Sequence, residues 1–289
     1  MRQYIPMILG LSVTSIYDSA MEILSLVIAM LITGAIGGVL AGLLGIGGGI
    51  VIVPMLEAAL AFVGVDAAVR MHIAVATSLA TIIPTSISSA RAHYVRQSID
   101  FGIVRYWVPW IVVGAGLGIL IAANVGGDFL AAVFAVVALA VAVKMALPLD
   151  DTHLADDIPR GVFGPAIPLG IGSISTLMGI GGGTLSVTAM TLSGKAIHLA
   201  VGTASLLGLV IALPATLGYV VSGWGNPLLP VASLGYVNLL GFAVIAPATV
   251  LFAPLGARIA HALPRRRLSA LFGLLLFIVA VRMTLRAIA

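Results

Sequence analysis

The sequence contains no cysteine and few charged side chains: 14 Lys and Arg and 10 Asp and Glu among 289 residues. The missing cysteine excludes disulfides, thiolate metal sites and cysteine nucleophiles. A soluble domain carries about 25% charged residues, whereas this chain carries 8% and is 61% hydrophobic. We therefore expect an integral membrane protein surrounded by a lipid bilayer. The net charge of +4 comes from loop Lys and Arg and does not indicate nucleic-acid binding.

Long polar segments are missing as well. The longest is 148–160, which contains Asp150, Asp151, Asp156 and Asp157. A segment of this length cannot form a large ligand-binding domain, so the sequence does not support a receptor or scaffold role. This segment divides the chain into an N-terminal interfacial segment (1–22), a first membrane unit (23–147), a cytoplasmic linker (148–160) and a second membrane unit (161–289). A membrane-spanning helix needs about 20 apolar residues, and both units contain such runs.

The motifs of intramembrane enzymes do not occur. A rhomboid-type protease would need G-x-S-x-G with a partner histidine, and a metalloprotease would need H-E-x-x-H. Neither pattern is present, and no group of carboxylates accompanies the histidines to bind a metal. We therefore expect no enzymatic activity, no cofactor and no metal.

The two membrane units repeat each other in sequence. Leu44–Gly49 (LGIGGG) recurs as Met178–Gly183 (MGIGGG), and His72–Thr77 (HIAVAT) recurs as His198–Thr203 (HLAVGT). Later residues also pair: Pro109 with Pro247, Phe134 with Phe272, and Lys144 with Arg282. Each unit is thus predicted to be a Gly-broken re-entrant hairpin followed by three transmembrane helices. The fold class is an all-α polytopic membrane protein.

Loop charges predict that the two repeats are inverted relative to each other. The loop with Arg91, Arg96 and Arg105 has an uncharged counterpart at 222–238, whereas 122–128 has only an acid and its counterpart 256–267 is rich in arginine. Loops rich in Lys and Arg stay cytoplasmic, so equivalent loops should lie on opposite sides. Arg282 and Arg286 would then lie outside, against the rule.

The glycine clusters predict helix breaks at membrane depth. Backbone groups cannot stay unpaired in lipid, so Gly45–Gly49 and Gly179–Gly183 must be buried in protein or line a polar cavity. Inverted repeats with broken helices are typical of secondary transporters, whose substrate binds near the midplane. Helices starting at Ile50 and Thr184 would present free N–H groups to an anion there. Close helix packing is the alternative, which we prefer for Gly34-xxx-Gly38 and Gly114-xxx-Gly118.

Hydroxyl groups beside the breaks can donate to a bound oxyanion, although such groups also bond to their own helix carbonyls. Thr77 and Thr203 occupy matched positions in the two halves. We therefore predict a substrate site built from both breaks and the helices that follow them: Gly45, Gly47, Gly48, Gly49, Thr77, Ser78, Gly181, Gly182, Gly183, Thr184, Thr203 and Ser205.

Charged and titratable residues near the breaks are candidates for coupling or gating: Glu57, Arg70, His72, Lys195 and His198. Glu57 is the single acid within a predicted membrane segment, and such acids are candidates for proton transfer; an interfacial position is the alternative. The histidines either anchor their helices at the interface or carry a proton. Arg70 and Lys195 either attract anions to the two ends of the transport pathway, on opposite sides of the membrane, or face solvent and lipid headgroups.

The segment Ala41–Pro54 (AGLLGIGGGIVIVP), the segment Ala74–Leu79 (AVATSL) and their second copies resemble the sulfite exporter TauE/SafE family, also called the 4-toluene sulfonate uptake permease family. The resemblance covers roughly residues 23–286 and departs at Thr188, where the first copy has Pro54. It implies transport of sulfite, sulfoacetate, sulfonates or other organic anions.

We therefore predict a multi-pass transporter of the plasma (inner) membrane that carries sulfite or a small organosulfonate or organic anion. Export is favoured because the interior-negative potential contributes about 2.3 kcal/mol per charge per 100 mV. An anion channel of the same fold and a proton-coupled importer are the alternatives. The sequence leaves the anion, the coupling and the oligomeric state open, a homodimer included.

Overall fold

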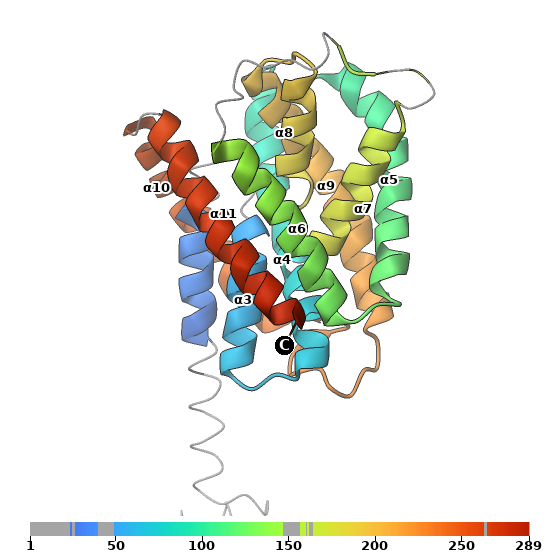
Figure 1. Cartoon of the computed structure of the whole chain (residues 1–289), viewed down its shortest axis with the longest axis vertical. Helices are drawn as coiled ribbons and strands as arrows, with labels where there is room; N and C mark the ends of the chain where they lie inside the picture. The colour runs from blue at the N-terminus through green and yellow to red at the C-terminus, as the bar shows by residue number, and fades with distance from the viewer. Residues whose placement is uncertain are drawn as a thin grey trace, which may run out of the picture.

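The computed structural model describes residues 24, 27–39, 49–146, 157–159, 161, 164–262 and 265–288. These residues form a bundle of helices that run roughly side by side (Figure 1). The predicted interfacial segment, most of the linker, and Gly45, Gly47 and Gly48 of the first glycine cluster lie outside the described residues.

The helices follow the same order in both halves of the chain. In the first half, a helix at Val27–Val39 is followed by α3 (Gly49–Phe62), α4 (Ala67–Val95), α5 (Phe101–Ala122) and α6 (Gly127–Ala146). In the second half, α7 (Ala166–Met178) and α8 (Gly183–Leu192) precede α9 (Ile197–Ser222), α10 (Leu239–Ala262) and α11 (Arg265–Ile288). Each half thus has two short helices and then three long ones, as the repeat predicts.

Four of these helices, α4, α5, α6 and α9, are long and apolar enough to cross a membrane. Large apolar side chains on them stay exposed in the isolated chain, including Leu120 at 63%, Val136 at 67% and Leu217 at 65%. Lipid would cover such side chains, whereas water would not favour them. The prediction of a helical polytopic membrane protein is therefore confirmed.

The second glycine cluster separates α7 from α8. Gly179, Gly181 and Gly182 have φ angles of +72°, +61° and +72°, a region that side chains other than glycine rarely occupy. Gly179 ends α7 and Gly182 precedes the first residue of α8. Three residues with positive φ therefore turn the chain between two short helices, as the glycine pattern predicted.

Glycines elsewhere let helices pack closely. A Cβ at Gly118 would lie 2.7 Å from the carbonyl oxygen of Ser173 on α7, and one at Gly34 would lie 2.7 Å from Cβ of Ala248 on α10. The expectation that Gly34 and Gly118 serve helix packing is confirmed.

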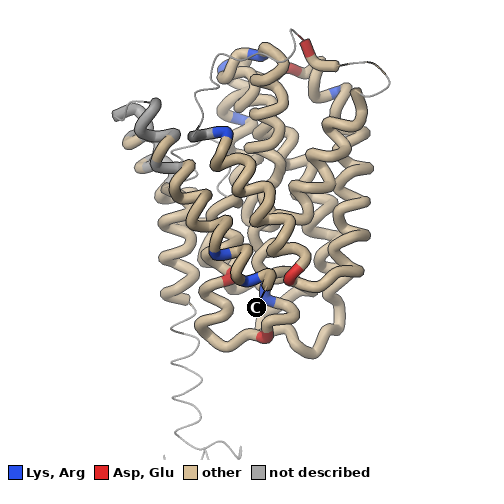
Figure 2. Tube along the Cα trace, in the orientation of Figure 1, with Lys and Arg blue, Asp and Glu red and all other residues tan. Residues whose placement is uncertain are grey.

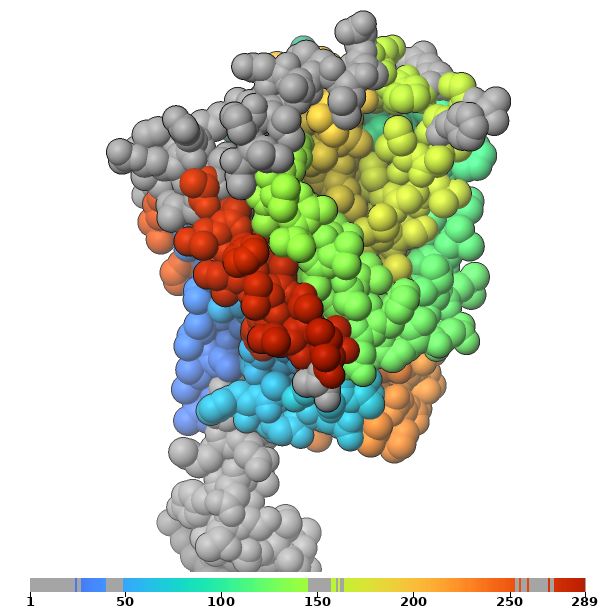
Figure 3. Space-filling model, viewed as in Figure 1, coloured from blue at the N-terminus to red at the C-terminus, as the bar shows by residue number. Residues whose placement is uncertain are grey.

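On another face of the bundle, α6 and α11 lie side by side (Figure 3).

The loops after α4 and α9 differ in length and lie at different ends of the bundle. The loop 96–100 contacts the start of α9, where Gly202 has no room for a side chain beside Ser98. The loop 223–238 contains the short strands β1 (Ser233–Leu234) and β2 (Val237–Asn238) and contacts the first half of α4, where Tyr236 stacks on His72. Most charged residues lie toward the two ends of the bundle (Figure 2).

Candidate functional site

The start of α3 lies directly against the break between α7 and α8. A Cβ at Gly49 would be 2.6 Å from the carbonyl oxygen of Gly179 and 2.9 Å from Cα of Ile180. The Ser78 hydroxyl on α4 donates to the same Gly179 oxygen at 2.8 Å. The residue that ends the first glycine cluster therefore touches the second cluster, and α4 holds the two in place.

Several backbone N–H groups at this break have no recorded acceptor among the described residues. The N–H groups of Gly179 and Ile180 donate to the Ser175 carbonyl, and that of Ser186 donates to the Gly182 carbonyl. For residues 181–185 no acceptor is recorded within the described part of the chain. The first N–H groups of a helix carry partial positive charge and attract anions, so the start of α8 is a candidate anion-binding position.

A small cavity of about 30 Å³ lies beside the break. A water molecule needs roughly 10–15 Å³ by this measure, so the cavity has room for about two waters or for one compact anion of similar size. Its lining comes from α4, the break and α9: Ile82, Thr85, Ser86, Ser89, Ile180, Gly181, Gly183, Val201, Ala204, Ser205 and Gly208. None of these described residues is charged, so backbone amides and hydroxyls are the available donors.

The structure places part of the sequence-predicted site at this cavity. Gly181, Gly183 and Ser205 line it. The Ser205 hydroxyl donates its single proton to the Gly202 carbonyl at 2.7 Å, so in this arrangement it does not donate to an anion. Gly182 lies beside it, with the side chain of Ile211 and the hydroxyl of Ser175 against the position that a Cβ would take. Thr184 in the first turn of α8 is buried.

Thr77 and Thr203 lie elsewhere and make matched contacts. The Thr77 hydroxyl accepts the N–H of Asn238 at 3.0 Å, and the Thr203 hydroxyl accepts the N–H of Asp100 at 2.9 Å. Neither threonine is among the described residues that line the cavity. Their contact with substrate stays a prediction, while the contacts seen here are structural.

Sequence reasoning missed the hydroxyl-bearing face of α4. Thr85, Ser86 and Ser89 line the cavity, and only Thr85 has its hydroxyl bonded to helix carbonyls, those of Thr81 and Ile82. The signal was present in the sequence, because hydroxyl residues at helical spacing follow Pro84 in an otherwise apolar helix.

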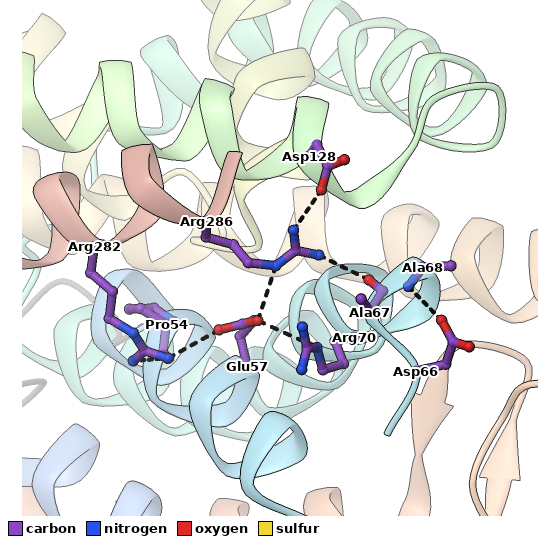
Figure 4. Close-up of polar contacts among 9 residues, drawn as sticks. All are labelled: Pro54, Glu57, Asp66, Ala67, Ala68, Arg70, Asp128, Arg282 and Arg286. Atoms are coloured by element: carbon purple, nitrogen blue, oxygen red, sulfur yellow. Dashed lines mark hydrogen bonds and ion pairs between the residues drawn. The ribbon is translucent and has the colours of Figure 1, made fainter. Parts of the chain in front are cut away.

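Glu57 lies in a cluster of arginines at the end of the bundle where α3 ends and α4 begins (Figure 4). Its buried carboxylate is 3.0 Å from Arg282, 3.3 Å from Arg286 and 3.6 Å from Arg70. Arg286 also pairs with Asp128 at 2.6 Å. Three arginines thus surround one buried carboxylate. A coupling role for Glu57 stays a prediction. Arg282 and Arg286, the two cations that the loop-charge argument places outside, are thus paired with acids.

The remaining coupling candidates are separated in space. His72 is buried, with Nε2 3.1 Å from the Ala122 carbonyl oxygen, and its ring stacks on Tyr236. Lys195 pairs with Asp157 at 2.8 Å, and His198 is exposed. The two histidines therefore have different surroundings despite their matched positions in the repeats.

Long apolar helices and a glycine break, with a small uncharged cavity beside it, define a multi-pass helical membrane protein. The profile of the sulfite exporter TauE/SafE family matches residues 30–283. The chain therefore belongs to the TauE/SafE family and is a membrane transporter, as its sequence motifs indicated.

Relatives in distant organisms agree with this assignment. A protein of Haemophilus influenzae described as a probable membrane transporter protein is 34% identical over 260 residues, which cover 90% of this chain and 98% of the relative. Probable membrane transporter proteins of Bacillus subtilis (29% identical, 71% of this chain and 82% of the relative) and Methanocaldococcus jannaschii (27%, 91% and 97%) are also similar. No solved structure is significantly similar to the chain.

Proposed function

We propose that this transporter exports sulfite or a small organosulfonate or organic anion, which binds where the two glycine breaks meet. The observation that carries the proposal is the set of N–H groups without recorded acceptors at residues 181–185, beside an uncharged cavity. Free amides at the start of a helix favour an anion without a buried cation.

The neutral character of the site suits a carrier that must release its substrate. An anion held by a buried arginine would gain strong charge-assisted bonds, whereas amides and hydroxyls offer weaker and more numerous contacts. The membrane potential supplies about 2.3 kcal/mol per charge per 100 mV toward the outside. Export down this potential therefore needs no coupling ion.

We further propose that the repeats are inverted, with the linker 148–160 in the cytoplasm. The proposal is supported by the loops after α4 and α9, which occupy matching positions in the two repeats. One contacts the start of α9, and the other contacts the first half of α4. Inversion brings the two breaks together near the midplane, as in other transporters with broken helices.

The test uses purified protein in liposomes loaded with sulfite. We expect sulfite to leave down its gradient, with an outward movement of negative charge that a voltage-sensitive dye detects. Flux equal to that of protein-free liposomes for sulfite and for small sulfonates would contradict the proposal. Saturation at millimolar sulfite with slow turnover would separate a carrier from a channel of the same fold.

A further inference from the structure

One cavity-lining residue on α4 and one on α9 occupy equivalent positions in the two repeats. The spacing that pairs Thr77 with Thr203 also pairs Ile82 with Gly208. Both residues line the cavity, but one carries a branched four-carbon side chain and the other carries none. The cavity is therefore shaped differently on its two sides, although the surrounding helices repeat.

Ile82 fills the space between the start of α3 and the break before α8. Its side chain is 2% exposed, and its terminal carbons lie 3.1 Å and 2.8 Å from the positions that a Cβ would take at Gly49 and Gly181. The side chain thus contacts the start of α3 and the break before α8 at once. It limits how far a bound molecule can extend in that direction.

Gly208 leaves the opposite side open in front of Ser86. A Cβ at Gly208 would lie 3.0 Å from both the Ser86 hydroxyl oxygen and the Gly181 carbonyl oxygen, a separation that would crowd both groups. The Ser86 side chain is 8% exposed, and no hydrogen bond of its hydroxyl is recorded within the described residues. Ser86 is therefore a buried donor that faces the cavity beside the free amides of the break.

We propose that Ser86, Ile82 and Gly208 determine which anions the transporter accepts. The inference rests on the proposed function, in which this cavity holds the transported anion. Ser86 donates to one oxygen of the anion, and Gly208 gives that oxygen room. Ile82 restricts any substituent on the anion to about the size of a methyl group. The site therefore selects compact oxyanions over those with aromatic or long alkyl groups.

The test compares sulfite, methanesulfonate and benzenesulfonate in proteoliposomes. Ser86→Ala should raise KM for sulfite about tenfold, since it removes a hydrogen bond to a charged group. Ile82→Ala should raise the transport of benzenesulfonate relative to sulfite. Gly208→Ala should slow all three, and benzenesulfonate most. The matched control is Ser88→Ala on the same helix, where the side chain is exposed and outside the cavity lining; it should behave as the wild type.

The outcomes separate this inference from the proposed function. A wild-type protein that moves none of the anions would contradict the proposed function itself. A wild-type protein that moves sulfite, with unchanged KM in Ser86→Ala and unchanged selectivity in Ile82→Ala, would overturn the inference alone. Thermal unfolding of each variant in detergent checks folding, and Ile82→Val provides a milder enlargement if Ile82→Ala is unstable. Selectivity ratios are the deciding readout because a purely structural defect lowers transport of all anions alike.

Discussion

The hydroxyl of Thr77 accepts the backbone N–H of Asn238 across 161 residues of sequence, and both residues are fully buried. In the other half of the chain, Thr203 accepts the N–H of Asp100. Asn238 and Asp100 each precede a long helix and cap its first turn with a side-chain oxygen. Each repeat therefore supplies the threonine that fixes the start of a helix in the other repeat.

Replacing Thr77 with valine should destabilise the protein, because the buried N–H of Asn238 loses its acceptor. An unsatisfied buried group costs about 1–3 kcal/mol. Thr203→Val should cost less, since Asp100 is only partly buried. Thermal unfolding in detergent measures both effects, with Thr77→Ser as the control that keeps the hydroxyl. Normal stability with lost sulfite transport would instead support the prediction that these hydroxyls contact substrate.

Glu57→Gln should lower stability by up to about 3 kcal/mol, because it leaves three arginines without their shared buried carboxylate. The double variant Glu57→Gln with Arg282→Gln should recover part of this loss, since paired residues are not additive. Chemical unfolding of the single and double variants provides the comparison. A stable Glu57→Gln protein whose transport has lost its pH dependence would show that Glu57 carries a proton after all.

Gly182→Ala should abolish transport while leaving the protein in the membrane. At φ +72° a side chain costs roughly 1–2 kcal/mol, and here the new methyl would also displace Ile211. Gly64→Ala is the matched control, because Gly64 has φ +78° but no atom within 4 Å of its Cβ position. Flux assays should find Gly64→Ala active. Equal transport activity in both variants would show that Gly182 only forms the turn and has no role in transport.

The absence of cysteine allows the sidedness of the chain to be measured with single introduced thiols. Ala92→Cys near the end of α4 and Leu228→Cys in the loop after α9 are both exposed positions. A membrane-impermeant maleimide added to intact cells should label residue 228 and spare residue 92 until the cells are lysed. Labelling of both positions from outside would contradict the proposed inversion.

The helical order could be predicted from sequence because its signals are local. Apolar run length, the repeated LGIGGG and MGIGGG motifs and the positions of charged loops gave the two short and three long helices of each half. Gly179 and Gly182 took positive φ, as glycine-rich turns require. Most of the linker and the first three clustered glycines lie outside the described residues.

The site was harder to predict because it depends on which faces of α4 and α9 turn toward the break. Matched sequence positions suggested that Thr77 and Thr203 act alike, and they do, but on backbone N–H groups of the opposite repeat. The first repeat has Ile82 where the second has Gly208, and this difference makes the cavity asymmetric. The similarity of the two repeats does not reveal that asymmetry. Similarly, two of the three arginines around Glu57 come from α11, 225 and 229 residues away in sequence.

The most direct test of the proposed anion site is a structure of the wild-type protein soaked with selenite, a heavier analogue of sulfite whose selenium gives an anomalous signal. We expect one selenium peak in the cavity, within hydrogen-bonding distance of the amides of Gly181 and Gly183 and of the Ser86 hydroxyl. A peak at the arginines around Glu57, or a cavity that stays empty at selenite concentrations that saturate transport, would contradict it.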